Sequence, residues 1–527
     1  MSFNTLLQIP FANISGIDIL LAATPVILLV LLLGILKLPG DKSAFITLIA
    51  TILIAIFTFH LSPEDTGISF VYGMVKAIFP ILIIIIMAIY SYNVLMHTKK
   101  MEVIKEQFSS ISSDKSVQVL LLTWGFGGLL EGMAGFGTAV AIPAAILISL
   151  GFKPIFSAVA SLIANSVATG FGAVGTPVKA LATESGIGME NIQQLSADIV
   201  IQLSPLMFII PLIITVMTEP TLKALPKNLL LSLIVGAVSL ATQYITATHM
   251  GAETPAIIGS IASIIAIIIF GKLLKKKDGG KAQKRYTIRQ ILEAWSVYGL
   301  ILILIILTSP LFPSIREALQ SICVTNFKFS INTTLIDGTS AAVDKIHTVT
   351  WLTDAGVLLF LGATIGGLIQ GAKITELLKL LWKTAIQQKK TIITVICLIG
   401  LSTIMDLSGM IAVLGYALAT FTGSLYPLFA PTIGCLGTFL TGSDTSSNIL
   451  FGKLQSTVAG QIGSDPVWLT AANTAGATGG KIISPQSIAV ATSAIGQQGK
   501  EGEIMKKSLP WALVYIVVAG LMVYFLA

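Results

Sequence analysis

Long runs of apolar residues, separated by short polar segments, occupy most of the chain. An α-helix rises 1.5 Å per residue, so about 20 apolar residues cross a hydrocarbon core that is roughly 30 Å thick. The pattern therefore predicts an all-α polytopic membrane protein with about 12 spanning helices. These spans are expected at residues 17–36, 44–61, 70–95, 154–182, 199–218, 229–248, 255–273, 294–308, 352–370, 428–454, 468–492 and 509–527.

Two other apolar stretches contain a glycine-rich interruption and fit no single span. The limb from Val117 to Glu131 would extend only about 22 Å as a helix, which is too short to cross. Non-helical backbone at membrane depth is tolerated where protein or a water-filled cavity surrounds it. We therefore expect two re-entrant hairpins, at residues 116–151 and 391–424.

The distribution of basic residues orients these spans, because cytoplasmic loops carry an excess of Lys and Arg. Most of the 32 basic residues fall on one side, and only Arg316, Lys328 and Lys345 fall on the other. The rule places the N-terminus and the polar stretch 310–350 outside, and the basic loop after Lys272 inside. The first apolar run follows no basic residue, so it is expected to be a retained span rather than a signal peptide.

The chain also contains an internal repeat, in which Glu131 of the first copy matches Asp406 of the second. Repeats with helices broken at matching places are typical of secondary transporters. The predicted domains are 1–67 (N-terminal spans), 68–245 (repeat 1: arm 98–115, hairpin 116–151, broken helix 154–183), 246–349 (connecting spans and outer loop) and 350–527 (repeat 2: arm 371–390, hairpin 391–424, broken helix 427–456).

The relative orientation of the two copies stays open at this point. Most transporter repeats are inverted, whereas the distribution of basic residues puts both arms inside and gives the copies one orientation. A weaker alignment, of residues 165–177 on residues 473–485, covers a single segment.

Composition excludes a soluble protein. Hydrophobic residues make up 54% of the chain and charged residues 11%, with a mean hydropathy of +0.90, against roughly 25% charged residues in soluble domains. The basic residues lie between apolar runs, so no nucleic-acid partner is expected despite the net charge of +7. Cys323, Cys397 and Cys435 lack metal-ligand spacing and cannot all pair, so neither a disulfide framework nor a zinc site is indicated. No cofactor or metal is expected.

Each predicted hairpin carries one acidic residue near its tip. Glu131 lies in a glycine-dense apolar stretch, and Asp406 shortly precedes Gly409. An acidic residue at mid-membrane costs about 2.5 to 3.5 kcal/mol on insertion scales, so such a group is usually protonated, paired or functional. We interpret Glu131 and Asp406 as proton-coupling residues; a static hydrogen bond to the hairpin backbone is the alternative.

The interrupted spans and tips supply candidate substrate ligands. Unwinding frees backbone N–H groups, and the half-helix that follows offers a positive dipole end, which together suit a carboxylate. A buried lysine nearby would either pair with an acidic side chain or bind an anionic substrate. Lys481 is preferred in this role over Lys179 and Lys453. The candidate substrate-binding residues are Gly135, Gly137, Ser443, Asp444, Thr445, Asn448, Asn473 and Lys481.

Other classes of function are less well supported. The sequence contains no phosphate-binding loop, no H-E-x-x-H motif and no visible nucleophile–base pair, so a membrane-embedded enzyme is the weaker hypothesis. A channel is a second rival, and accumulation of substrate against a gradient distinguishes a transporter from it.

These motifs resemble those of the L-lactate permease family, which covers lactate and glycolate permeases. The resemblance extends over essentially the whole chain and is most specific at residues 129–137, 165–177, 441–448 and 472–486. It implies a bacterial cell-membrane permease that takes up L-lactate and related 2-hydroxymonocarboxylates, such as glycolate, with protons. The implied partners are this small-molecule substrate, protons and the lipid bilayer, and nothing in the sequence indicates the oligomeric state.

The order of arm, hairpin and broken helix is also similar to that of the ion-transporter superfamily, whose dicarboxylate carriers work as elevators. This resemblance implies a scaffold part and a transport part. Paired Ser-Asn-Thr tips bind sodium in those carriers, whereas Glu131 and Asp406 stand at the predicted tips here. Proton coupling is therefore favoured, and a sodium-coupled carboxylate symporter is the alternative.

Overall fold

The computed structural model describes residues 15–36, 38–109, 112, 114–135, 137–274, 286–334, 340–497 and 500–527. Within these residues, ten helices are long and apolar enough to cross a membrane, or eleven if one bent helix pair counts as a span. A polytopic helical membrane protein is therefore confirmed. The number is below the expected 12, partly because the span predicted at 352–370 is a helix of only 15 residues, α17 (Ala355–Ile369). The basic loop that follows Lys272 falls largely within 275–285, outside the described residues.

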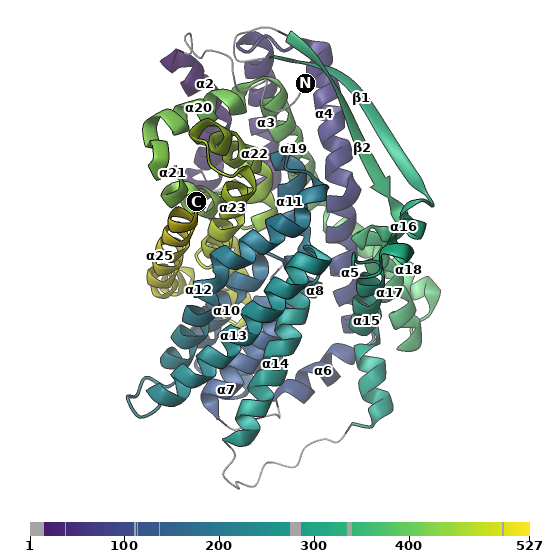
Figure 1. Cartoon of the computed structure of the whole chain (residues 1–527). Coiled ribbons are helices and arrows are strands. Elements are labelled where there is room, and N and C mark those ends of the chain that lie inside the picture. Colours follow the sequence, from purple (N-terminus) through teal and green to yellow (C-terminus); the bar gives the residue numbers. More distant parts are fainter. Residues whose placement is uncertain are drawn as a thin grey trace.

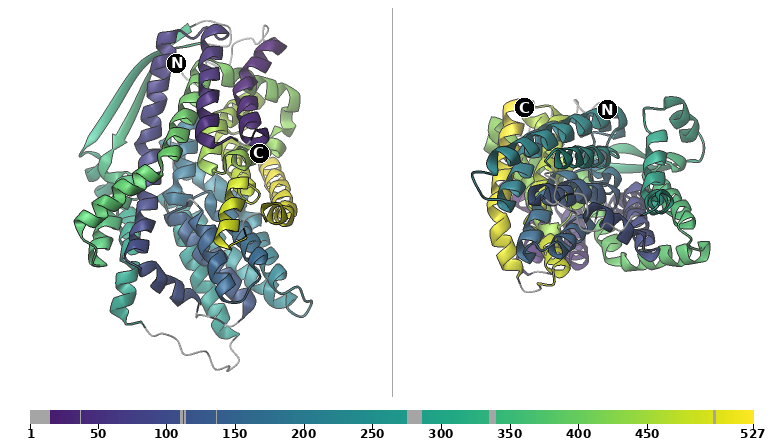
Figure 2. Two further views of the ribbon diagram at one scale, coloured as in Figure 1. Left: turned by 180° about the vertical axis from the view of Figure 1, so that it is seen from behind. Right: turned by 90° about the horizontal axis from the view of Figure 1, so that it is seen from below.

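A framework of helices surrounds the elements that form the site (Figures 1 and 2). The N-terminal framework elements are α2 (Gly16–Val30), η1 (Leu31–Ile35), α3 (Gly40–Phe57), α4 (Pro63–Lys76), η2 (Ala77–Leu82) and α5 (Ile83–His97). The others are α6 (Lys100–Ser109), η4 (Met189–Asn191), α12 (Ile192–Thr218), α13 (Leu225–Met250), α14 (Pro255–Leu273), α15 (Ile288–Leu307), α16 (Pro313–Gln320), η5 (Trp351–Thr353), α18 (Ile374–Gln387), α19 (Lys389–Leu407), α20 (Met410–Thr422), η6 (Gly423–Leu425) and α25 (Glu501–Leu526). The two basic arms form the helices α6 and α18, and both pack against α5.

The first re-entrant hairpin is present where the sequence predicts it. Its elements are α7 (Lys115–Leu120), η3 (Leu121–Phe126), α8 (Gly127–Met133) and α9 (Thr138–Ser149). With 12 residues, α9 reaches only about 18 Å and cannot cross the membrane. Its N-cap, Gly137, has a φ of +84°, a conformation that glycine adopts without steric cost. The two limbs pack so closely that a Cβ on Gly127 would lie 3.2 Å from the Ala139 carbonyl oxygen.

The first broken helix is also present. The helices α10 (Pro154–Thr169) and α11 (Gly172–Ser185) meet at an angle of 50°. Three successive residues at the start of α11, Ala173, Val174 and Gly175, have positive φ values, so the right-handed helix cannot run through them. The carbonyl of Ala252, between α13 and α14, lies directly against Gly175, where a side chain would not fit.

The structure differs from the sequence prediction at the second hairpin, which was expected at 391–424. Helix α19 is long enough to span and packs against α3 and α4, whereas α20 packs against α22 and α2. These two helices therefore do not form the limbs of one hairpin. A glycine interruption can mark either the tip of a hairpin or a change of direction between two separate helices. Gly409, which precedes α20, marks a change of direction.

The second hairpin is formed instead by the segment that was predicted as the broken helix 427–456. Its limbs are α21 (Tyr426–Thr441) and α22 (Asp444–Ile462). The chain reverses at Gly442, which has a φ of +71°, and Ser443 caps α22. The limbs run antiparallel, because the Ser447 hydroxyl donates to the Gly434 carbonyl at 2.7 Å while Tyr426, at the far end of α21, donates to Gln455 at 2.9 Å.

A second broken helix replaces the single span expected at 468–492. It consists of α23 (Pro466–Lys481) and α24 (Pro485–Ala494). Ser484 caps α24 by accepting from the Ser487 N–H, and proline occupies the first helical position, where its missing N–H costs nothing. The weaker of the two repeat alignments therefore describes the structure better, because it matches α10 and α11 with α23 and α24.

The two hairpins enter from opposite directions. Helices α11 and α22 run parallel, because Asn448 donates to the Pro177 carbonyl and Ser456, two turns later, donates to the Ser185 carbonyl. Helix α10 rises from the base of the first hairpin to the break, and α11 continues beyond it. Since α22 runs with α11 from its tip to its base, the base of the second hairpin lies on the far side (Figure 1). The repeats are inverted, as in most secondary transporters.

A two-stranded antiparallel ribbon, which the sequence did not predict, forms part of the stretch 310–350. Its strands are β1 (Val324–Thr334) and β2 (Ser340–Thr350). The ribbon lies along α4 (Figure 1), and the Asn332 N–H donates to the Asp65 carboxylate at 2.8 Å. Side chains alternate between a face on α4 and an exposed face, as a period of two requires.

Backbone packing between α21 and α23 yields a stability prediction. A Cβ on Gly476 would overlap the Pro431 carbonyl oxygen of the neighbouring helix. Gly476→Ala should therefore lower the free energy of unfolding by about 1–3 kcal/mol, as overpacking does. The measurement is the thermal unfolding midpoint in detergent. Gly502→Ala, on a helix with no atom within 4 Å of the added Cβ, is the matched control, and equal midpoints for both variants would contradict the packing argument.

Candidate functional site

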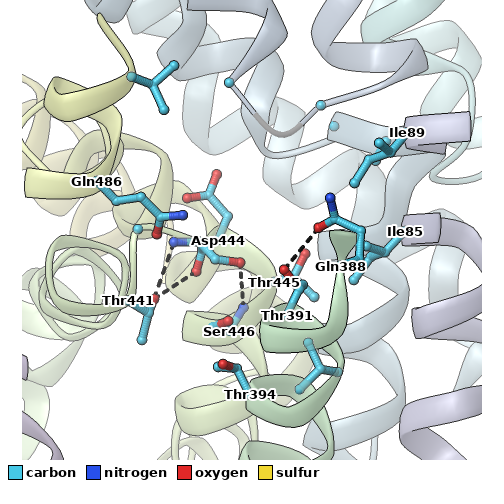
Figure 3. Close-up of a pocket in the computed structure, with 18 of the residues that line it drawn as sticks. Ile85, Ile89, Gln388, Thr391, Thr394, Thr441, Asp444, Thr445, Ser446 and Gln486 are labelled. Carbon is cyan, nitrogen blue, oxygen red and sulfur yellow. Dashed lines mark hydrogen bonds between the residues drawn. The ribbon is translucent and has the colours of Figure 1, made fainter. Parts of the chain in front are cut away.

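A cavity of about 610 Å³ lies where the two hairpin tips meet the two helix breaks (Figure 3). This volume is in the range of about 300–1,000 Å³ that small-molecule sites occupy. Each tip lies against a break, because a Cβ on Gly135 would lie 3.2 Å from that of Ala173, and a side chain on Gly442 would overlap Gln486. The polar and glycine lining residues include Glu131, Gly135, Gly137, Thr138, Thr169, Gly172, Thr441, Gly442, Ser443, Asp444, Thr445, Ser446, Lys481, Gln486 and Ser487.

Glu131 stands at the tip of the first hairpin with its carboxylate in the cavity wall. The residue is only 2% exposed. Its Oε1 lies against the backbone at the first break, where a Cβ on Gly172 would approach it to 2.7 Å. Its Oε2 is buried and accepts no hydrogen bond from the described residues. A buried carboxylate oxygen without a donor is costly, so this site has an unmet need for a proton or a donor group.

Asp444 is the equivalent group at the tip of the second hairpin. It occupies the first position of α22 and is 2% exposed. Thr438 donates to its Oδ1 at 3.1 Å, while its Oδ2, like the free oxygen of Glu131, has no hydrogen-bond partner among the described residues. The N-terminal end of α22 carries Ser443, Thr445 and Ser446 into the cavity, and the positive end of the helix dipole favours an anion there.

Lys481 lies close to Glu131 and acts electrostatically on Asp444. It is the last residue of α23, and its Nζ lies 3.8 Å from Glu131 Oε1. Lys481 and Glu131 are also the charged neighbours of Asp444. One ammonium can neutralise only one of the two buried carboxylates. The group of three therefore has a net charge of −1 when all are ionised.

The rest of the wall and the rim differ in character. Ile85 and Ile89 of α5 face the cavity opposite Asp444 (Figure 3). The rim includes Asp41, in the first turn of α3, and the segment from Gln387 to Thr394 at the junction of α18 and α19. The distribution of basic residues places both parts of the rim on the cytoplasmic side.

Two predicted substrate ligands lie outside the cavity lining. Asn448 is fully buried and donates to the Pro177 carbonyl at 2.9 Å and to the Thr474 hydroxyl at 2.8 Å. Asn473 donates to the Asn448 side chain at 2.9 Å and accepts from Gln455 at 3.2 Å. These amides are occupied by protein partners, so they join α11, α22 and α23 rather than face a ligand.

Asp406, the second predicted proton-coupling residue, lies in a different place from Glu131. It ends α19 and pairs with Lys453 of α22, at 3.7 Å, and it does not line the cavity. The reason is the altered position of the second hairpin, which puts Asp444 rather than Asp406 at its tip. Lys179 is likewise outside the lining, paired with Glu253 at 2.8 Å.

The sequence analysis did not single out Thr441, Gln486 or Ser487, which also line the cavity. The signal for Gln486 and Ser487 was available. Ser484 followed by proline is a helix-start pattern, and it occurs in the weaker repeat alignment.

Comparison with known proteins identifies the family. The sequence profile of the L-lactate permease family matches residues 18–527. The chain belongs to the L-lactate permease family. An L-lactate permease of Streptococcus iniae is 38% identical over 458 residues, which cover 86% of this permease and 93% of that protein. The glycolate permease GlcA of Escherichia coli K12 is 33% identical over 537 residues, covering 96% and 95% of the two chains.

These relatives, together with an L-lactate permease of Bacillus subtilis that is 31% identical over 542 residues, are bacterial transporters. This permease is accordingly a multi-pass transport protein of the cell membrane. Among solved structures, the YdaH transporter of Alcanivorax borkumensis matches with a TM-score of 0.47 at 13% identity, over 87% of each chain.

The hydrogen bonds of Asn448 separate a structural role from a ligand role. Asn448→Ala leaves the Pro177 carbonyl and the amide of Asn473 without their partner, so we expect the free energy of unfolding to fall by about 1–3 kcal/mol. Thr445→Ala, which alters a hydroxyl in the cavity wall, should leave the unfolding midpoint within error and raise the half-saturating substrate concentration. An Asn448→Ala protein of wild-type thermal stability would argue for the ligand role.

Proposed function

We propose that this permease takes up L-lactate and related 2-hydroxymonocarboxylates, such as glycolate, together with protons. The observation that carries the proposal is that Lys481, Glu131 and Asp444 lie together in the cavity wall. The names of the relatives, L-lactate permease and glycolate permease, support the substrate class.

The charges of the site provide the coupling. With both carboxylates ionised, the group of three has a net charge of −1 and repels a monocarboxylate anion in a medium of low dielectric constant. One proton on Glu131 or Asp444 removes that repulsion and leaves Lys481 available to the substrate. The anion and the proton therefore favour each other's binding, which is the thermodynamic requirement for symport.

The remaining contacts fit a small hydroxy acid. Lys481 and the N-terminal end of α22 would hold the carboxylate, as helix N-termini do with anions. The hydroxyls of Ser443 and Thr445 would contact the 2-hydroxyl group, and the backbone at Gly135 and Gly137 would close the wall.

The transport step is a movement of tips and breaks against the framework. The rim lies at Asp41 and at 387–394, on the side that the basic residues mark as cytoplasmic, so the cavity corresponds to an inward-facing state. In an elevator-like movement, the two hairpins and the two broken helices would travel together past α3, α5 and α19 and expose the cavity to the outside.

Glu131→Gln tests the coupling. The amide keeps the shape of the side chain but holds no proton, so lactate accumulation driven by a pH gradient should fall at least tenfold in proteoliposomes. Exchange of internal for external lactate, which needs no net proton movement, should persist. Glu376→Gln, on an exposed surface of α18, is the matched control and should retain both activities.

Two outcomes of that experiment would count against the proton proposal. Equal loss of accumulation and exchange would assign Glu131 a role in binding rather than coupling. Accumulation that depends on a sodium gradient and ignores the pH gradient would support the sodium-coupled alternative.

Lys481→Met tests the anion ligand. Removing the ammonium leaves two buried carboxylates without their cation, so we expect the half-saturating lactate concentration to rise by at least tenfold, in line with the 2–5 kcal/mol attributed to loss of one member of a buried charge pair. Lys507→Met, at a half-exposed position of α25, is the control. Wild-type lactate affinity in the Lys481→Met protein would remove this residue from the site.

A further inference from the structure

A second group of charged side chains lies away from the cavity and has no part in the function proposed above. It consists of Lys76, Glu184, Lys345, Asp406 and Lys453, which we name the outer cluster. Lys76 and Glu184 form a buried ion pair of 2.8 Å between α4 and α11. Lys453 and Asp406 form a longer pair of 3.7 Å between α22 and α19. None of these residues lines the cavity.

The ribbon contributes the fifth member. Residues directly opposite each other in an antiparallel pair share a face, and Lys345 is opposite Phe329. The ring of Phe329 packs against Tyr72 of α4 at 5.2 Å, and the Lys76 ammonium lies 5.1 Å from the ring of Tyr72. The inner face of the ribbon thus directs Lys345 toward the cluster, where Asp406, Lys453 and Lys76 are the charges that act on it.

The cluster has an excess of positive charge. Three lysines face two carboxylates, which gives +1 where the cavity has −1. Burial lowers the pKa of Lys345, and the neighbouring Lys453 and Lys76 lower it further while Asp406 raises it. This lysine is half-buried, and within the described residues it has no ion pair within 4 Å.

The cluster is partly exposed at its edge. The side chains of Asp406 and Lys453 are 34% and 19% exposed. The separation of 3.7 Å exceeds a direct hydrogen bond, so the pair of Lys453 and Asp406 is a loose one. Lys345 is one of few basic residues on the side that the charge distribution places outside, where the substrate arrives.

We propose that the outer cluster is a second carboxylate-binding site, in which Lys345 captures the substrate anion before it reaches the cavity and the charges of Lys453 and Lys76 add to the attraction. The inference rests on the proposed function for the class of ligand. A net positive site at the entrance raises the local concentration of an anion, and a partly exposed charge contributes to this in a salt-dependent way. The ribbon then supplies Lys345 to the outer cluster.

Sided transport kinetics test this proposal. In right-side-out membrane vesicles, Lys345→Met should raise the half-saturating external lactate concentration by about five- to tenfold, the order expected for one partly screened unit charge. Efflux from preloaded vesicles, which starts at the cytoplasmic cavity, should stay within twofold of the wild type. Lys345→Arg retains the charge and should restore the wild-type value. High ionic strength should reduce the difference between wild type and Lys345→Met.

Lys328→Met is the matched control, because Lys328 lies on the same ribbon with its side chain on the exposed face. It should change neither uptake nor efflux. A Lys345→Met protein with the wild-type half-saturating lactate concentration would overturn the proposal. Equal changes in uptake and efflux would also overturn it, because they would indicate a purely structural role for Lys345.

The outcome is separable from that of the proposed function. Lys345→Met should retain pH-driven accumulation at saturating lactate, because Glu131 is intact. If the wild-type protein takes up lactate and the Lys345→Met protein has the same half-saturating concentration, only the proposal for the outer cluster is overturned. Absence of hydroxy-acid uptake by the wild-type protein would overturn the proposed function and the proposal for the outer cluster with it.

Discussion

Backbone groups that leave a helix at membrane depth must be satisfied by protein or by a cavity, because lipid offers no hydrogen bonds. This constraint accounts for the meeting of two hairpin tips and two helix breaks in one place within the described residues. The tips at Gly137 and Gly442 and the breaks after Thr169 and Lys481 each expose backbone that no lipid-facing position would accept. Packed against one another, they surround a polar chamber. The inverted arrangement of the repeats brings a tip and a break from each side to the same depth, so the site is a consequence of the fold's symmetry.

The same chamber determines which charges the chain tolerates in its interior. Burying one carboxylate is expensive, and burying two beside a single ammonium leaves the need for one more positive charge. Glu131 and Asp444 each retain a buried oxygen that accepts no hydrogen bond from the part of the chain that the structure describes. The outer cluster has the opposite imbalance, with three lysines to two acids. On the proposed route, an anion would pass from a site of net charge +1 to one of net charge −1, where a proton is needed to offset the repulsion.

Four candidates from the sequence, Glu131, Ser443, Asp444 and Lys481, line one cavity in the structure. Glu131 was chosen as an acidic residue in a glycine-dense apolar stretch, Ser443 and Asp444 as part of an interrupted span, and Lys481 as a lysine buried near acidic groups. The second hairpin was misplaced because hydropathy cannot distinguish a reversal from a bend. The helices α21 and α22 together are apolar and long enough for a span, and only the antiparallel contact between Ser447 and Gly434 shows that the chain turns back. Asn448 and Asn473 show a second limit. An asparagine that hydrogen-bonds to other protein groups and one that binds a ligand look the same in the sequence. Only the structure shows which partners each one has.

Those asparagines bear on how the permease moves. Asn448 of α22 donates to Pro177 of α11 and to Thr474 of α23. Buried hydrogen bonds therefore join the second hairpin to parts of both broken helices. Asp444 of α22 and Lys481 of α23 therefore belong to one hydrogen-bonded unit. The ion pairs of the outer cluster, by contrast, join that unit to the framework, Glu184 of α11 to Lys76 of α4 and Lys453 of α22 to Asp406 of α19. A movement of the unit past the framework must therefore rearrange these ion pairs, whereas the hydrogen bonds of Asn448 stay within the unit.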